Sequence, residues 1–394
     1  MARSVRVSAT WHKDSVKRLT GRTKNYAWGS TTAFSSLTGA DPSELPEAEI
    51  WYGAHPDAPS LLPDGSTLNE AIKADPIKTL GPAVHARHPA RLPFLLKLLA
   101  ADSPLSIQAH PTIEQAIAGY EAEDYAEIDY RAPNRSFRDR SPKPELLVAI
   151  TRFEALVGFR EAESTIALLH LLDGGLLTKV VETTGLFAAV RWLLNPTSGE
   201  APDVAKAIAD ISATAATYSG TDRADEIALI NRIAQTYPDD PGIGVATLLN
   251  QFVLEPGEGV YLDAGTLHAY VGGLGVEIMA NSNTVLRGGL TPKHVDVEAL
   301  LKVLHGEVSN VLPTHMDDDG QYLTPASEFA LSVIADSRSV SGPAIVLSVD
   351  KASTVATTDR TVELAPTEAV WLDADELAEV TSSGGLTFVA EVGQ

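Results

Sequence analysis

One short segment carries side chains of two types that bind metal ions. In residues 105–111, alternation along a strand puts Ser106, Gln108 and His110 on one face and apolar residues on the other. An amide oxygen and an imidazole are both good metal ligands, but a lone Gln-x-His pattern is more often a surface feature or part of a satisfied core. By itself this segment permits either interpretation.

Other charged residues stand in strands that are otherwise apolar. Lys143 and Glu145 share a face at the start of one such strand, which fits an ordinary ion pair as well as a catalytic pair. Glu277 lies in an apolar strand where an unpaired carboxylate would be costly, and Lys97 lies within the apolar run 94–99. Internal ion pairs are the structural alternative for both of these residues.

The stretch 256–270 has the most specific pattern. A turn, a short strand and an Ala-Gly corner precede His268, and Gly265 frees the backbone just before that histidine. This is the sequence shape of a metal motif in a small jelly-roll barrel. We expect His268 and Tyr270 to point inward together.

Two further cations follow in the next segment. Arg287 precedes a pair of glycines that lets a ligand or the backbone approach closely, and Lys293 comes shortly after. With Lys97 and Lys143 they make four cations in a strongly acidic chain. Such a group is what an anionic substrate needs against long-range repulsion.

Composition excludes several classes of protein. The 394 residues include 30 Lys and Arg against 52 Asp and Glu, a net charge of −22, and no cysteine. Disulfides, thiolate metal sites and thiol nucleophiles are therefore excluded, and the acidic balance argues against nucleic-acid binding. No apolar run approaches the roughly 20 residues that span a bilayer. We expect a cytoplasmic protein with no membrane partner, and a loosely held basic tail at residues 1–18.

The periodicity of apolar residues predicts the domain organisation. Short β segments dominate residues 19–155 and 248–308, apart from helices at 66–74 (with Ser66 as N-cap), after His110 and near 296–304. Spacings of three and four residues predict a helical insert at 156–247. Alternating strands return in a β module at 309–394.

These motifs, in this order, resemble those of the type I mannose-6-phosphate isomerases, which are zinc enzymes of the cupin superfamily. The resemblance covers most of residues 20–305. It implies a mainly β fold with two cupin-like jelly-roll modules and an inserted α-helical domain. It implies one zinc ion per chain, and the family's ligands fall on Gln108, His110, Glu145 and His268.

The resemblance also assigns the substrate site. The family's active-site arginine falls on Arg287 and its strand glutamate resembles Glu277, while its basic residues resemble Lys97, Lys143 and Lys293. We expect Ser106, Tyr270 and His55 to face the substrate as well. The C-terminal module has a faded copy of the motif without a histidine, so we expect it to bind no metal.

Three positions depart from the family pattern. Pro142 stands where histidine is common, Ala109 replaces a more usual valine, and Asn283 replaces an aspartate. Because an amide cannot act as a base, the third departure weakens any mechanism that relies on that carboxylate.

The implied reaction interconverts mannose-6-phosphate and fructose-6-phosphate through an enediol or enediolate. Glu277 is the candidate base, because burial would raise its pKa toward neutrality, and His55 is a second candidate for ring opening. We expect Lys97 and Lys143 near the metal and sugar, and Arg287 and Lys293 toward the phosphate, although Arg287 also suits the enediolate. The alternatives are a metal-dependent cupin oxygenase and a non-catalytic sugar-binding cupin. We expect a monomer.

Overall fold

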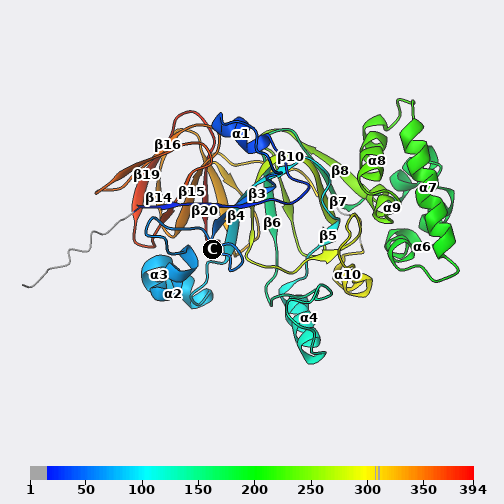
Figure 1. The fold of residues 1–394 in the computed structure, drawn as a ribbon, viewed down its shortest axis with the longest axis horizontal. Helices are drawn as coiled ribbons and strands as arrows, with labels where there is room; N and C mark the ends of the chain where they lie inside the picture. The colour runs from blue at the N-terminus through cyan, green and yellow to red at the C-terminus, as the bar shows by residue number, and fades with distance from the viewer. Residues whose placement is uncertain (1–15, 307, 309–310) are drawn as a thin grey trace, which may run out of the picture.

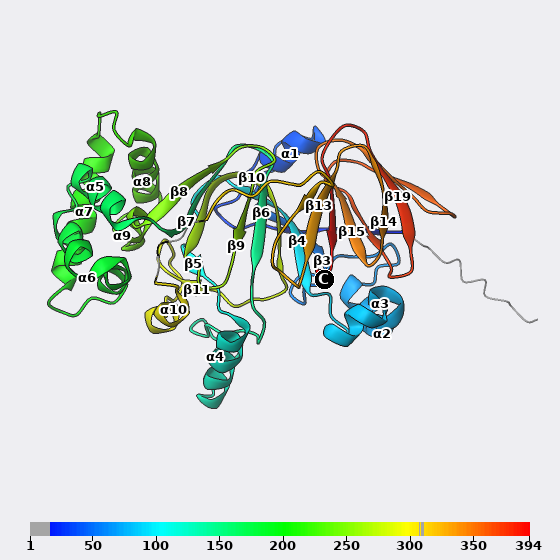
Figure 2. The ribbon, with the colours of Figure 1, turned by 180° about the vertical axis from the view of Figure 1, so that it is seen from behind.

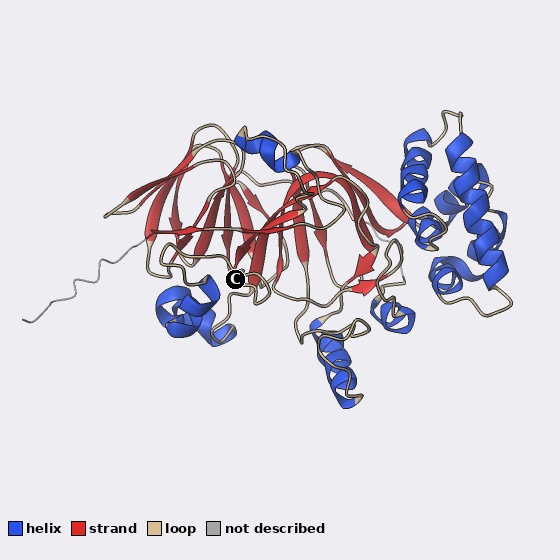
Figure 3. Ribbon diagram, viewed as in Figure 1, coloured by secondary structure: helices blue, strands red, loops and turns tan. Residues whose placement is uncertain are grey.

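The computed structural model describes residues 16–306, 308 and 311–394. Strands fill the middle and one end of the molecule, and five consecutive helices, α5 to α9, stand together at the other end (Figure 1). The reverse view shows the same arrangement from behind (Figure 2). Helices and strands both take large parts of the chain (Figure 3), so the fold is mixed and the expectation of a mainly β protein understates its helices.

The larger sheet has ten strands, all paired antiparallel, and holds most of the predicted site residues. Its longest strand, β10, pairs with β4, β5, β6 and β7. The strands are β2 (Arg22–Lys24), β3 (Glu49–Gly53), β4 (Phe94–Ala101), β5 (Gln108–Ala109), β6 (Glu145–Ala149), β7 (Phe153–Phe159), β8 (Leu249–Leu254), β9 (Gly259–Leu262), β10 (His268–Ala280) and β11 (Leu286–Arg287).

Strand β4 shows why the central strands are so apolar. Leu96 and Leu98 point into a core that also contains Trp371 and Phe388 of the C-terminal strands. Lys97 and Leu99 point the other way, toward a pocket. A strand covered on both faces needs apolar residues at nearly every position, and here the lysine is the exception.

The helices fall into two groups. The consecutive group comprises α5 (Ala162–Leu171), α6 (Gly175–Leu194), α7 (Ala201–Thr217), α8 (Ala224–Thr236) and α9 (Gly242–Thr247). The others are α1 (Ala33–Thr38), α2 (Leu68–Ala74), α3 (Pro76–Arg87), α4 (Ile113–Tyr125) and α10 (Val297–Val303). Strand β7 continues to Phe159, so the helices begin later than residue 156. In the described residues, no helix combines the length and apolar character needed to cross a bilayer.

The C-terminal strands form a six-stranded and a four-stranded sheet. They are β12 (Gln321–Tyr322), β13 (Ala330–Ile334), β14 (Ser337–Ser341), β15 (Ala344–Ser348), β16 (Ser353–Ala356), β17 (Thr361–Leu364), β18 (Ala369–Leu372), β19 (Leu377–Ser382) and β20 (Thr387–Glu391). One edge of the six-stranded sheet is β1 (Val16–Leu19), which pairs with β18. Residues 16–18 are therefore strand and not tail, and the rest of the expected tail, 1–15, lies outside the described residues.

One local expectation about helices is wrong, and one helix was not predicted. Helix α2 is capped by Thr67, which shares a capping box with Glu70, whereas Ser66 bonds to Asp64 through its hydroxyl at 2.6 Å. Helix α3 follows directly and was not expected, because Gly81 and Pro82 interrupt its pattern; Gly81 has a φ of 79°.

Candidate metal centre and pocket

Three of the predicted ligands meet in the core of the larger sheet. His110, Glu145 and His268 each offer one ligand atom, and these atoms all lie within 4.8 Å of one another. His110 follows β5, Glu145 begins β6 and His268 begins β10, so three separate strand ends supply the cluster. All three residues are buried.

Two buried polar atoms of this cluster lack an ordinary hydrogen-bond partner among the described residues. Glu145 Oε2 and His268 Nε2 have no hydrogen-bond partner among the described residues, although 3.5 Å separates them. His110 Nε2 lies 3.3 Å from Glu145 Oε1. Leaving buried acceptors unsatisfied is costly, and a divalent cation between them removes that cost. Imidazole nitrogen and carboxylate oxygen are donors that suit zinc, so the cluster fits this ion.

Backbone carbonyls orient both imidazoles. Nδ1 of His110 lies 3.2 Å from the Thr284 carbonyl oxygen, and Nδ1 of His268 lies 2.9 Å from that of Thr266. An Nδ1–H that donates to a carbonyl leaves the Nε2 lone pair free for a metal ion. Both histidines therefore present the atom that faces Glu145.

Protonation in the cluster also favours metal binding. Burial, and then the ammonium of Lys143, lower the pKa of His110 to about 3, so its imidazole is neutral. Burial opposes ionisation of Glu145, but Lys143 and His110 outweigh it and hold the pKa of this carboxyl well below its ordinary value. Lys143 Nζ lies 2.8 Å from Glu145 Oε1. This confirms that Lys143 and Glu145 share a face.

Gln108 and Arg287 lie beside the cluster by strand register. Gln108 of β5 pairs with His268 of β10 on one side and with Arg287 of β11 on the other. Directly opposed residues point to the same face of a sheet, with their Cβ atoms roughly 5 Å apart. Gln108 therefore stays a predicted fourth ligand, with Arg287 as its neighbour.

A second group of buried charged residues lies farther along β10, around Glu277. Lys97 Nζ is 2.6 Å from Glu277 Oε2 and 3.3 Å from Glu49 Oε1. Register explains the first pair, because Glu277 and Lys97 are directly opposite. Trp51 completes the group, since its indole N–H donates to Glu49 Oε2 at 2.8 Å.

One ammonium and two carboxyl groups share this second group, and they shift one another's pKa values. Burial raises the pKa of Glu277, and the carboxylates of Glu145 and Glu49 add to the effect against the opposing ammonium of Lys97. Burial alone would lower the pKa of Lys97, but the surrounding carboxylates raise it. Lys97 is therefore charged and bound to carboxylates, and Glu277 has the raised pKa expected from its sequence environment.

Both groups border one pocket of about 1170 Å³: Glu145 of the metal cluster lines it, as do Lys97 and Glu277 of the second group, whereas the two histidines lie behind its lining. Ser106, Tyr270 and His55 all line it, as do the other predicted substrate-site residues. Tyr270 Oη is buried and has no hydrogen-bond partner among the described residues. Burial lowers the pKa of His55 to about 4, and its Nδ1 accepts from the Asp57 backbone N–H at 3.2 Å, so the imidazole is neutral at pH 7.

Two further residues of this pocket were not predicted from the sequence. Glu49 lies two positions before Trp51 on the same face of β3, and this alternation was the available signal. Arg138 comes from a loop without regular periodicity.

Asn283 stands at the family's aspartate position. It donates from Nδ2 to Asp57 Oδ2 at 2.9 Å, and the Asp139 carboxylate accepts from the Asn283 backbone N–H at 2.6 Å.

Comparisons with known proteins agree with the site. A family model for the phosphomannose isomerase type I catalytic domain matches residues 16–162. The mannose-6-phosphate isomerases of Escherichia coli and Salmonella typhimurium are 33% and 35% identical to the chain, each over 94% of this chain and 97% of the relative.

Solved structures are similar as well. The mannose 6-phosphate isomerase of Salmonella typhimurium bound to its substrate and zinc has a TM-score of 0.86 at 32% identity, covering 96% of this chain and all of that one. Another mannose 6-phosphate isomerase structure, bound with zinc and yttrium, also has a TM-score of 0.86. On this evidence the chain belongs to the type I phosphomannose isomerase family.

Proposed function

We propose that this chain is a zinc-dependent isomerase that interconverts mannose-6-phosphate and fructose-6-phosphate. The observation that carries the proposal is the buried cluster of His110, Glu145 and His268, whose Glu145 lines the same pocket as the Glu277–Lys97 pair. An isomerase of this kind needs an electrophile for oxygen and a base for carbon within one site. The activity of the relatives supports the substrate.

The residues present suit one zinc ion, with Gln108 joining His110, Glu145 and His268 as ligands. When bound, zinc polarises a sugar oxygen and stabilises negative charge that develops on it. Lys143 lies against Glu145 and adds a fixed positive charge at that end of the pocket. Such preorganised charge is typically worth a few kcal/mol in the transition state, on the order of 3 kcal/mol per donor.

We propose Glu277 as the base that moves the proton. From the open-chain aldose, its carboxylate takes the hydrogen from C2, and the electron pair forms the C1–C2 double bond of an enediolate with negative charge on O1. Return of the proton to C1, with the O2 proton passing to O1, gives the ketose. A raised pKa suits a group that must both accept and return a proton.

The remaining pocket residues are proposed to bind and orient the sugar phosphate. Arg287 and Lys293 are the candidates for the phosphate end. Ser106 and Tyr270 face the sugar, and His55, neutral at pH 7, is the candidate for ring opening. Lys97 acts on Glu277, because its ammonium is occupied by carboxylates.

The fold supports the finer architectural proposal. We infer two cupin-like jelly-roll modules, one at 19–155 plus 248–308 and a metal-free one at 309–394, with the α5–α9 helices inserted in the first. The antiparallel sheets at the two ends of the strand region are consistent with this division. We propose a cytoplasmic monomer.

The test is an isomerase assay on the purified, zinc-loaded chain. Mannose-6-phosphate is supplied, and fructose-6-phosphate is measured by a coupled dehydrogenase, with oxygen uptake recorded in parallel. Ketose formation without oxygen uptake supports the proposal. Binding of mannose-6-phosphate without ketose formation would contradict it in favour of a sugar-binding protein, and oxygen uptake would point to an oxygenase.

A further inference from the structure

Three cations line one part of the pocket without carboxylate partners. Arg138, Arg287 and Lys293 all face the pocket, and within the described part of the chain none of them forms an ion pair with a carboxylate. Lys97 and Lys143 differ, because carboxylates lie within 3 Å of both ammonium groups. The free positive charge of the pocket is therefore concentrated on the first three residues.

These three positive charges repel one another. Burial, and then the charge of Arg138, lower the pKa of Arg287. Burial, Arg287 and Arg138 together lower the pKa of Lys293. Like charges held near one another in a partly desolvated pocket are unfavourable until an anion joins them, and a phosphate dianion neutralises them most completely.

Arg138 owes its place to a loop that is held by buried side-chain hydrogen bonds. The loop connects α4 to β6, and the side chain of Arg135 is only 2% exposed beneath it. Arg135 donates to the carbonyl oxygens of Phe137 at 3.0 Å and Ile128 at 2.6 Å, and to Asp124 Oδ1 at 2.7 Å.

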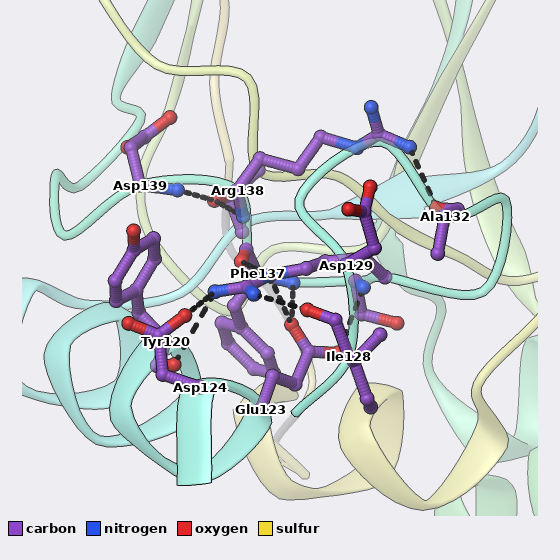
Figure 4. A network of polar contacts seen from close by, with 12 residues as sticks. Tyr120, Glu123, Asp124, Ile128, Asp129, Ala132, Phe137, Arg138 and Asp139 are labelled. Atoms are coloured by element: carbon purple, nitrogen blue, oxygen red, sulfur yellow. Dashed lines mark hydrogen bonds and ion pairs between the residues drawn. The ribbon is translucent and has the colours of Figure 1, made fainter. Parts of the chain in front are cut away.

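Helix α4 holds the same loop from its own side. Glu123 accepts from the backbone N–H groups of Ser136 and Phe137, both at 2.8 Å. Figure 4 shows Phe137 beside Glu123 of this helix, while the Arg138 side chain extends away from the helix and donates from Nη2 to the Ala132 carbonyl oxygen at 3.3 Å.

The loop is also tied to the metal cluster. Buried Thr284 accepts from the Arg138 backbone N–H through Oγ1 at 3.0 Å, and its carbonyl oxygen faces His110 Nδ1 at 3.2 Å. One threonine thus fixes the distance between a metal ligand and Arg138. A substrate that contacts both the metal cluster and Arg138 must match the distance between them.

We propose that Arg138 is a specificity-determining residue that binds the phosphate of the substrate together with Arg287 and Lys293, and that Arg135 is the positioning residue that holds Arg138 there. The inference rests on the proposed function for the identity of the substrate. The choice of Arg138 and Arg135 rests on the unpaired cations of the pocket and on the hydrogen bonds of Arg135.

The first test compares Arg138→Ala with Arg140→Ala. Arg140 stands two positions along the same loop but is half exposed, stacks on Tyr120 at 4.1 Å from the ring centroid and does not line the pocket. We expect Arg138→Ala to raise KM for mannose-6-phosphate about tenfold or more with a smaller change in kcat, because a charge-assisted contact to phosphate is lost. Arg138→Lys should recover part of the loss. An unchanged KM in Arg138→Ala would overturn the assignment.

A second measurement separates this inference from the proposed reaction. Inorganic phosphate is titrated into each zinc-loaded protein by calorimetry, without any sugar. The inference requires weaker phosphate binding in Arg138→Ala than in wild type and Arg140→Ala, whether or not the wild type forms ketose. Equal phosphate binding in all three proteins would overturn the inference even if isomerisation is observed.

The positioning role is tested with Arg135→Lys, which keeps the charge but loses the forked contacts to three acceptors. We expect it to raise KM in the same direction as Arg138→Ala, and the double variant to be no worse than Arg138→Ala. If the two effects multiply instead, Arg135 does not act through Arg138. A circular dichroism melt of each variant checks that it is folded.

Discussion

Glu277 is the residue on which the proposed proton transfer depends. We expect Glu277→Gln to lower kcat by about 10² to 10⁴, because an amide cannot accept the C2 proton. Bound zinc, measured by atomic absorption, should stay unchanged, since Glu277 is not among the clustered ligands. Glu363→Gln, on an exposed face of β17, is the matched control. Turnover that survives in Glu277→Gln would remove this residue as the base.

The neighbouring lysine sets the pH at which that base works. The ammonium of Lys97 favours the ionised form of Glu277 and so opposes the rise in the pKa of this carboxyl. Removing the charge in Lys97→Met raises that pKa further. The active, ionised base is then lost at a higher pH, so the acid limb of the kcat/KM profile should move to higher pH.

Lys24→Met is the control for this pH shift. Lys24 lies over the same Trp51 ring at 4.4 Å from its centroid, but it is not among the charged groups that chiefly shift the pKa of Glu277. Its profile should match the wild type. An acid limb that moves to lower pH in Lys97→Met, or does not move, would contradict the role given to Lys97.

At this scale the sequence was informative where motifs set the spacing. His110, Glu145 and His268 were expected as ligands and meet within 4.8 Å. Lys97 was expected near the metal and sugar, and it lines the pocket. Its bonds to Glu277 and Glu49 were not predicted, because strand register between β3, β4 and β10 decides which charges face each other. A single chain carries no direct signal of register between distant strands.

Among the structural elements, the corner before β10 positions the metal ligand. Gly265 has a φ of 74°, and a Cβ at this position would lie 2.4 Å from the His305 ring and 2.7 Å from the Val303 carbonyl oxygen. We expect Gly265→Ala to destabilise the protein by about 2 kcal/mol or more and to weaken zinc binding, since the corner must move. Urea unfolding and a zinc-chelator competition measure the two effects.

Gly257→Ala isolates the steric part of this effect. Gly257 also has a positive φ, of 90°, but nothing lies within 4 Å of the added Cβ. The Gly257→Ala variant should be destabilised only by the backbone strain, about 1 kcal/mol, and should keep its zinc affinity. If the two variants behave alike, the contact with His305 and Val303 carries no energy.

Elements were predictable where the pattern was long and local. The helices over 162–247 and the helix expected near 296–304, which is α10, follow from the periodicity of apolar residues. The end of β7 was misplaced because a short apolar run suits a buried strand or a buried helix equally well. Ser66 and Thr67 both carry hydroxyls that can cap α2, and the bond from Ser66 to Asp64 leaves the cap to Thr67.

Over the whole molecule, one core joins the two strand regions. Leu96 and Leu98 of β4 pack in the same cluster as Leu347 of β15 and Trp371 of β18. We therefore expect Leu347→Ala, far from the pocket, to cost about 2 to 5 kcal/mol and to shift the loss of activity and of β structure together in urea. Separate transitions, with activity retained after the C-terminal sheets unfold, would show that the regions are independent.

The charge balance also acts at this scale. A net charge of −22 repels a sugar phosphate at long range, while Arg138, Arg287 and Lys293 gather positive charge inside the pocket. The acidic composition was visible in the sequence and correctly pointed to a local cation group. Arg138 was not, because its loop owes its shape to buried contacts of Arg135 and not to a periodic pattern.

Zinc removal and restoration tests the central claim most directly. The chain is stripped with a chelator, assayed with mannose-6-phosphate, and reassayed as zinc is added back in known amounts. We predict that fructose-6-phosphate formation disappears with the metal and returns in proportion to bound zinc, reaching its plateau at one ion per chain. Undiminished ketose formation by protein shown to contain no metal would contradict the account.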